Sequence, residues 1–242
     1  MDSILSLSNV SKSYGNFPVL KGIDLDIKKG EFLAILGPNG AGKTTLVKIM
    51  STLSSPSEGS VEINGHDVAD DTTSVRSMIG VISHETHLYN DLTAEENLRF
   101  FGKMYGIGAG ELEGRIDELL EQVELTGRAD DRVSTFSRGM KQRLSIARSL
   151  IHEPQLLFLD EPYTGLDQHA SLTFEKVLQE LDPQDNTRVM VTHDITNTFK
   201  MCSRVLILDG GKVVFDSLMS DISSAEELKE IYLSKVSNHI SV

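Results

Sequence analysis

A glycine-rich segment in the first quarter of the chain has the residue types needed to bind phosphate. Gly37 is followed by four other residues, then by Gly42, Lys43 and Thr44, a spacing typical of phosphate-binding loops. Glycines let backbone amides turn toward phosphate oxygens, the lysine neutralises the terminal phosphates, and the threonine hydroxyl is a magnesium ligand. The segment therefore predicts binding of ATP and Mg²⁺, rather than a simple glycine turn that caps a helix. The residues assigned to the nucleotide are Gly37, Pro38, Asn39, Gly40, Ala41, Gly42, Lys43, Thr44 and Thr45, with Lys43 also catalytic and Thr44 also a metal ligand.

Two adjacent acids later in the chain have the chemistry needed to split the bound nucleotide. Asp160 and Glu161 follow the apolar run at residues 156–159, and carboxylates at a buried strand end are costly unless a cation or water needs them. We assign Asp160 to magnesium and Glu161 to the general base that orients and deprotonates the attacking water. A strand end that merely meets solvent is the alternative, and the loop upstream favours the catalytic interpretation.

Both groups need strands to position them. Residues 32–36 are uniformly apolar and precede the glycine loop, and residues 45–53 are predicted to form the helix that follows it, the setting that a phosphate loop requires. Residues 156–159 and 189–191 are also uniformly apolar, which indicates central parallel strands covered on both faces. Ligand sites in such sheets lie at the carboxyl ends of the strands, so the loop and the acids are expected to meet there.

The other strand signals lie mostly near the start of the chain. Residues 4–10, 25–27 and 61–63 read as short strands, with Asn64-Gly65 as a tight hairpin turn. Together with residues 32–36, these early strands are predicted to be largely antiparallel. One further strand is expected at residues 205–208.

The middle of the chain changes to a helical period. Thr93 and Glu96 have capping-box spacing, a second helix is expected at about residues 111–123, and a third begins near Ser137 and stops before Pro154. Residues 91–152 are therefore predicted to be a helical lobe inserted between strand-rich segments. Ser223 and Glu226 predict the cap of a short surface helix near the end.

Composition excludes several classes of protein. The 242 residues include 39% hydrophobic and 24% charged residues, as in a soluble globular domain. A formal net charge of -13 argues against nucleic acid as the partner, since that binding needs clustered positive charge. No stretch approaches the roughly 20 apolar residues that cross a bilayer. The single cysteine, Cys202, suits a reducing compartment and is interpreted as a packed thiol.

With these residues in place, the chain resembles an ABC-type ATPase subunit over nearly its full length. The decisive segment, residues 136–148, is similar to the family signature that opens a helix just before the acidic strand. Ser137 and the amide of Gly139 would stand at a helix N-terminus, which is a second anion site. The resemblance implies that two such domains pair head to tail, so that each signature binds the nucleotide held by the opposite loop.

Three further positions match the family in order. Asp167, in the sequence Thr164-Gly165-Leu166-Asp167, resembles the residue that contacts the partner domain across the dimer. His193 resembles the catalytic switch histidine that holds the terminal phosphate and the attacking water. Tyr14 resembles the aromatic residue that stacks on adenine.

The chain also departs from the family pattern. Arg138 stands where glycine is usual, and Met140 where glutamine is usual. His84 occupies the position of a glutamine that touches magnesium and senses the nucleotide, so we assign it to both the nucleotide and the metal. An imidazole there would make coordination sensitive to pH.

The resemblance implies an α/β fold, with a phosphate-loop NTPase (RecA-like) core, an antiparallel β subdomain and an inserted helical subdomain. The expected division is residues 1–90 and 153–220 for the core and β subdomain, 91–152 for the helical subdomain and 221–242 for a helical tail. It further implies an ATP-hydrolysing transporter subunit at the cytoplasmic face of the cell membrane. Its expected partners are a second ATP-binding subunit, identical or related, and a separate transmembrane permease, with no nucleic acid.

Within the family, the segments at residues 84–89, 91–98 and 161–167 look most like bacterial exporter ATPases of the haem-exporter and ABC-2 type. One alternative is an ATPase of the same architecture that serves an assembly process, as in iron-sulfur assembly, without a channel. A phosphotransferase is disfavoured by the signature segment, and a translation or repair ATPase by the absence of a second cassette or a long coiled insertion.

Overall fold

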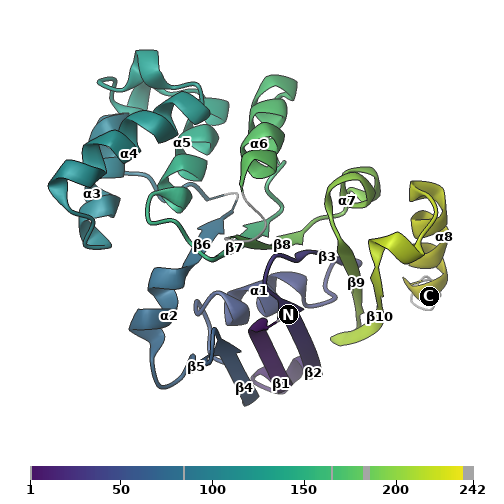
Figure 1. The fold of residues 1–242 in the computed structure, drawn as a ribbon. Coiled ribbons are helices and arrows are strands. Elements are labelled where there is room, and N and C mark those ends of the chain that lie inside the picture. Colours follow the sequence, from purple (N-terminus) through teal and green to yellow (C-terminus); the bar gives the residue numbers. More distant parts are fainter. Residues whose placement is uncertain (1, 84, 165, 182–185, 237–242) are drawn as a thin grey trace.

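The computed structural model describes residues 2–83, 85–164, 166–181 and 186–236, and Figure 1 shows their arrangement around two sheets. The strands are β1 (Ser3–Tyr14), β2 (Phe17–Lys28), β3 (Phe32–Leu36), β4 (Glu58–Ile63), β5 (His66–Asp67), β6 (Ile79–Ile82), β7 (Leu156–Asp160), β8 (Thr187–Val191), β9 (Arg204–Asp209) and β10 (Lys212–Leu218). The helices are α1 (Lys43–Met50), α2 (Thr72–Met78), α3 (Ala94–Met104), α4 (Ala109–Gln122), α5 (Arg138–Leu150), α6 (Gln168–Glu180), α7 (Ile195–Met201) and α8 (Ala225–Val236).

The central sheet has six strands in the order β10-β9-β3-β8-β7-β6. All neighbours pair in parallel except β10, which pairs antiparallel to β9 at one edge. The predicted central strands β7 and β8 are therefore confirmed. The antiparallel prediction for residues 32–36 is wrong, because β3 pairs in parallel with β8 on one side and with β9 on the other. Parallel neighbours are joined by crossover connections, and the element that follows β3 is a helix, α1.

A second sheet, in the order β2-β1-β4-β5, is antiparallel throughout. Its β4–β5 turn has positive φ at both Asn64 (50°) and Gly65 (80°), and Ile63 pairs with His66 across it. These are the backbone angles of a tight hairpin turn of the primed type. The hairpin predicted from this dipeptide is confirmed.

Helices α3, α4 and α5 pack against one another as a lobe at one end of the central sheet (Figure 1). The predicted capping box is formed, since the Thr93 hydroxyl accepts from the Glu96 amide at 3.1 Å and the Glu96 carboxylate accepts from the Thr93 amide at 2.8 Å. Ser137 caps α5 as expected. No helix within the described ranges is long and apolar enough to cross a membrane.

Two hydrophobic cores lie on opposite faces of the central sheet. Strand β3 contributes to both, because alternate side chains point to opposite faces: Phe32, Ala34 and Leu36 join the core shared with the helical lobe, and Leu33 and Ile35 join the core shared with α1 and the antiparallel sheet. All five residues are at most 4% exposed. The strand before the glycine loop is thus fixed on both faces.

The last helix begins one residue later than its capping spacing predicted. The Ser224 hydroxyl accepts from the amide of Glu227 at 3.1 Å, and the Glu227 carboxylate bonds back to Ser223. The predicted cap at Ser223 and Glu226 is therefore wrong by one position, because Ser224 and Glu227 take these places. Helix α8 packs on α7 and β9 and buries Leu228 completely.

The single cysteine is packed inside the protein, as predicted. Cys202 is 6% exposed, and burial raises the pKa of its thiol to about 12. A thiol in that state does not act as a nucleophile at neutral pH.

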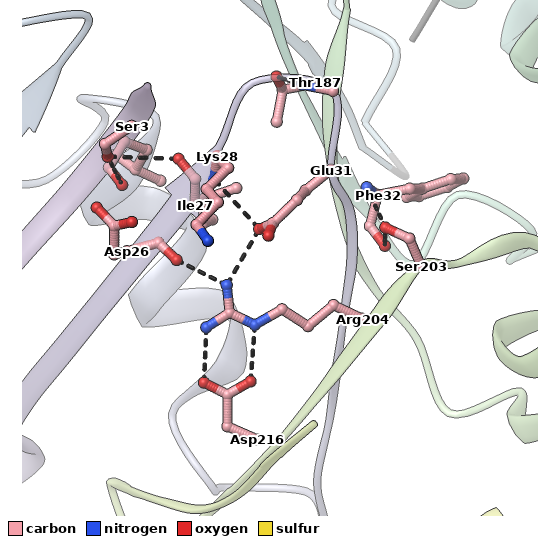
Figure 2. Close-up of polar contacts among 12 residues, drawn as sticks. Ser3, Asp26, Ile27, Lys28, Glu31, Phe32, Thr187, Ser203, Arg204 and Asp216 are labelled. Carbon is pink, nitrogen blue, oxygen red and sulfur yellow. Dashed lines mark hydrogen bonds and ion pairs between the residues drawn. The ribbon is translucent and has the colours of Figure 1, made fainter. Parts of the chain in front are cut away.

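The two sheets are joined by a network around Arg204 (Figure 2). Its guanidinium on β9 donates two hydrogen bonds of 2.7 Å to the Asp216 carboxylate on β10. It also donates to the Glu31 carboxylate at 3.0 Å and to the Asp26 carbonyl of β2 at 2.7 Å. The Arg204 and Glu31 side chains are each only 16% exposed. One cation therefore connects the antiparallel sheet to the strand that leads into the glycine loop.

We predict that Arg204→Gln lowers the free energy of unfolding by roughly 2–4 kcal/mol, because charged hydrogen bonds are lost and two carboxylates remain without their cation. Urea denaturation followed by circular dichroism measures this difference. Lys212→Gln, at an exposed position of β10, is the matched control and should change stability by less than about 0.5 kcal/mol. Equal effects of the two substitutions would contradict the assigned role of Arg204.

Candidate active site

The glycine loop lies between the carboxyl end of β3 and the start of α1. A side chain at Gly37 would place its Cβ 2.2 Å from the Leu208 carbonyl oxygen, and one at Gly42, where φ is 105°, would lie 2.8 Å from Leu20. Glycine is therefore required at both positions by close packing against β9 and β2. Gly42 precedes the first helical residue, Lys43, so α1 begins two residues earlier than residues 45–53 had predicted.

Lys43 folds back across this loop. Its ammonium donates to the Gly37 carbonyl at 2.8 Å and to the Pro38 carbonyl at 3.1 Å, and the residue is 9% exposed. Burial lowers the pKa of Lys43, while the negative charges of Glu161 and Asp160 act in the opposite direction. The structure thus brings the lysine and both predicted acids to the same edge of the sheet.

The remaining loop residues differ in exposure. Ala41 is buried, and its carbonyl accepts from the Gly211 amide at 3.1 Å. Asn39, Gly40 and Thr44 are exposed, and Pro38 and Thr45 are half-buried. The open side of the loop is therefore lined by backbone and small polar groups, which is the surface that a phosphate chain needs.

Glu161 and His193 come together although 32 positions separate them. Strands β7 and β8 are neighbours, with Asp160 opposite Val191, so the residues that follow them are adjacent in space. Glu161 has a positive φ of 50° and its amide donates to the Val191 carbonyl at 2.9 Å. Its carboxylate lies 2.9 Å from Nδ1 of His193, with the two side chains 29% and 79% exposed.

This arrangement has the chemistry of a proton acceptor held at a polyphosphate site. A non-glycine residue in the left-handed region is strained, and such strain is common where a side chain must be aimed. The hydrogen bond to imidazole fixes the direction of the Glu161 carboxylate. A water molecule beside that carboxylate could be deprotonated next to the ammonium of Lys43.

Two oxygen donors suited to magnesium border one cavity. Thr44, on the first turn of α1, and Asp160, at the end of β7, both line a groove of about 460 Å³. A hydroxyl and a carboxylate are the hard oxygen ligands that Mg²⁺ takes in proteins, so these residues fit the ion. The third predicted ligand, His84, lies outside the described residues.

The signature segment forms the start of α5, about 100 positions after the glycine loop. The Ser137 hydroxyl accepts from the Met140 amide at 3.2 Å, and a Cβ at Gly139 would lie 3.5 Å from the Asp167 carboxylate. Asp167 in turn caps α6 by accepting from the Ala170 amide at 2.8 Å. Within the described part of the chain, no hydrogen bond joins Ser137 or Gly139 to the glycine loop. The structure therefore groups these three residues together and not with the phosphate loop of the same chain.

Tyr14 ends β1 opposite Phe17 of β2. Its ring is 51% exposed, and the Lys12 ammonium lies 5.3 Å from the ring centroid. An exposed aromatic face of this kind is available for stacking.

Sequence reasoning missed the residues that hold α5 against β6. Gln142 is 5% exposed and donates to the Ser83 carbonyl at 3.2 Å, and Arg148 donates to the Val81 carbonyl at 3.2 Å. Six positions separate these two residues, so they do not share one face of the helix, and the polar character of both side chains was the only available signal. It did not identify β6 as the partner strand.

A glycine loop between a parallel strand and a helix, with acids at the end of the neighbouring strands, defines the phosphate-loop class of nucleotide hydrolases. The family model "ABC transporter" matches residues 20–164, so the chain belongs to the ABC transporter family. This confirms the resemblance, the α/β phosphate-loop fold and the identity of the chain as the ATP-hydrolysing, ATP-binding subunit of a transporter.

Known proteins resemble the chain over most of its length. The Linearmycin resistance ATP-binding protein LnrL of Bacillus subtilis (strain 168) is 38% identical over 221 residues, which cover 91% of this chain and 71% of that protein. The Nod factor export ATP-binding protein I of Cupriavidus metallidurans is 33% identical over 235 residues, covering 96% and 78%. A solved structure described as the dimeric post-hydrolysis state of the ATP-binding cassette MJ0796 bound to ADP and Pi has a TM-score of 0.81 at 32% identity, covering 89% and 98%.

The affinity for ADP should fall as the pH rises. We predict that this loss of affinity occurs at a lower pH in Glu161→Gln than in the wild-type chain. The glutamate charge raises the pKa of Lys43, so its removal lets the ammonium lose its proton earlier, and with it the attraction for phosphate. Titration of ADP between about pH 7 and 10 measures the effect. Glu226→Gln, on the remote helix α8, should match the wild-type profile. Identical profiles for all three proteins would contradict electrostatic coupling of Glu161 to Lys43.

Proposed function

We propose that the chain is the motor subunit of an ABC exporter, in which two copies, or this chain and a close relative, bind two ATP molecules between them. The observation that carries this proposal is the meeting of Glu161 and His193 at 2.9 Å, at the same sheet edge as Lys43. Support for the dimer comes from the dimeric cassette structure. Support for export comes from the names of the relatives, one of which is a Nod factor export protein.

In the proposed reaction the loop holds the triphosphate. Lys43 exchanges the carbonyls of Gly37 and Pro38 for oxygens of the terminal phosphates, and the backbone amides of residues 39–45 surround the chain of phosphates. Thr44 and Asp160, with His84 as the further assigned ligand, would hold Mg²⁺, which would supply positive charge to the phosphate oxygens. Tyr14 stacks on the adenine ring.

Glu161 then acts on water. Its carboxylate takes a proton as the water oxygen bonds to the terminal phosphorus, and the bond from that phosphorus to the ADP oxygen breaks. His193 keeps the carboxylate aligned through Nδ1 and contacts the terminal phosphate through the other side of its ring. ADP and inorganic phosphate are the products.

The signature of the partner domain completes each site. Ser137 and the amide of Gly139 stand at the N-terminus of α5, a helix of 13 residues whose dipole favours an anion. In the proposed dimer they contact the terminal phosphate held by the opposite chain, and Asp167 lies at the same interface. Hydrolysis removes the anion that links the two chains, and the dimer opens.

A separate transmembrane permease receives this motion at the cytoplasmic face of the membrane. Its docking site is the groove that contains Thr44 and Asp160 at one end, which we call the lateral groove. The residues that line the groove come from the core and from the predicted helical subdomain (residues 91–152), which are its two walls. Both walls would move when the dimer closes.

Glu161→Gln should abolish turnover while leaving ATP affinity within about threefold of wild type, because the amide keeps the shape of the side chain but cannot accept the proton. Phosphate release and equilibrium binding of ATP measure the two properties. Glu175→Gln, on helix α6, serves as the control. A normal rate of phosphate release by Glu161→Gln would exclude it as the base.

A mixing experiment tests the shared site. Lys43→Ala leaves the signature intact, and Ser137→Arg leaves the loop intact, so each variant alone should be inactive. Mixed in equal amounts, they should recover up to about a quarter of the wild-type sites, because half the dimers hold one complete site. Failure of every mixture to recover activity, with both variants folded and dimeric, would contradict a composite site.

A further inference from the structure

The chain leaves helix α4 in a conformation that glycine usually supplies. The amide of Glu124 donates to the Glu121 carbonyl at 2.9 Å, and the amide of Leu125 donates to the Leu120 carbonyl at 2.7 Å, which is the hydrogen-bond pattern of a Schellman motif. Glu124 takes the left-handed position of this motif, with φ at 56°. Glycine is the usual residue there because it adopts that conformation without strain. A glutamate at this position therefore points to a role for its side chain.

The Glu124 residue is contacted by two other helices, α5 and α6. On α5, Nη1 of Arg143 donates to the carbonyls of Val123 at 2.9 Å and of Glu124 at 3.1 Å. The same nitrogen lies 3.6 Å from the Glu124 carboxylate. On α6, Nε2 of His169 lies 2.9 Å from that carboxylate. One side chain at the end of α4 thus joins both helices.

The helices that Glu124 joins carry the residues of the proposed dimer interface. Arg143 lies in the second turn of α5, which is capped by Ser137 and has Gly139 in its first turn. His169 is the second residue of α6, directly after Gln168 and the cap Asp167. The two helices lie side by side (Figure 1), and a Cβ at Gly139 would be 3.5 Å from the Asp167 carboxylate. The contacts of Glu124 therefore hold α5 and α6 together close to the ends that face the partner domain.

These contacts contribute little to stability and nothing to the phosphate loop. The side chains of Glu124 and His169 are 47% and 69% exposed, and ion pairs between exposed groups are weak. Within the described part of the chain, no hydrogen bond or ion pair joins Glu124, Arg143 or His169 to the glycine loop. The binding of nucleotide by a single chain should therefore not depend on them.

We propose that Glu124 is a positioning residue for ATP hydrolysis, which fixes Asp167 relative to Ser137 and Gly139 so that both groups meet the partner domain together. This inference rests on the proposed function, because the spacing matters for turnover only where two chains share a site. A misplacement of about 1 Å far from the reacting atoms is enough to slow catalysis strongly.

Glu124→Gly separates positioning from stability. Glycine removes the strain as well as the exposed ion pair, so the melting temperature should stay within about 3 °C of wild type. The kcat for ATP hydrolysis should fall at least about fivefold, with the affinity for ADP unchanged. In the Glu161→Gln background, Glu124→Gly should weaken ATP-dependent dimerisation about threefold or more, as measured by analytical ultracentrifugation.

Glu153→Gly is the matched control. Glu153 also has a positive φ, of 52°, and its carboxylate also lies near an arginine, 3.5 Å from Nη1 of Arg115. That ion pair joins α4 to the segment before β7 and does not involve α6. Glu153→Gly should therefore leave kcat and dimerisation unchanged.

His169 provides the second test, because its exposed side chain can be removed without loss of the fold. His169→Ala should lower kcat about threefold, and adding it to Glu124→Gly should lower kcat no further, since both changes remove one contact. His169→Gln keeps an N–H donor of similar reach and should retain most of the wild-type rate.

The outcomes separate this inference from the proposed function. Normal kcat in either Glu124→Gly or His169→Ala, in a chain that dimerises on ATP, overturns the positioning role and leaves the shared site standing. A fall in kcat that Glu153→Gly shares, or that a lower melting temperature accompanies, also overturns it. If the Glu161→Gln protein binds ATP without dimerising, the shared site is overturned, and this inference with it.

Discussion

The burial of one ammonium group at the carboxyl edge of the central sheet is the interaction on which the site depends. Lys43 is 9% exposed, and an isolated buried charge would be costly. Two loop carbonyls accept its hydrogen bonds, and the charges of Glu161 and Asp160 favour its protonated form. A polyphosphate is a stronger partner for the same ammonium than two carbonyls are, so Lys43 is already positioned to neutralise phosphate charge.

That arrangement requires strands that are fixed from both faces. The alternate residues of β3 enter two separate cores, and β7 and β8 have buried side chains on both faces in the same way. Arg204 extends this rigidity to the antiparallel sheet through Asp216, Glu31 and the Asp26 carbonyl. Because this strand cannot shift, a side chain at Gly37 would collide with the Leu208 carbonyl. The loop therefore needs glycine at that position.

Helix α5 connects the signature residue Ser137 with the lateral groove. Ser137 caps its first turn, Gln142 in the middle donates to the Ser83 carbonyl, and Arg148 near its end lines the lateral groove. A helix of 13 residues is about 20 Å long and moves as a unit. A displacement of Ser137 at one end of α5 is therefore transmitted along the helix to Arg148 near the other end.

The sequence by itself determined the glycine loop, the two acids after an apolar strand, the capped helices of the lobe and the Asn64-Gly65 turn, because these depend on local backbone chemistry and on periodicity. It misassigned residues 32–36 to antiparallel pairing, because a uniformly apolar strand does not state its neighbours. Only the tertiary structure decided that Glu161 meets His193, that Lys43 folds onto the loop carbonyls, and that Glu124 contacts both Arg143 and His169. Those contacts join residues far apart in the chain, and their distances are set by strand order and helix packing, which no local pattern encodes.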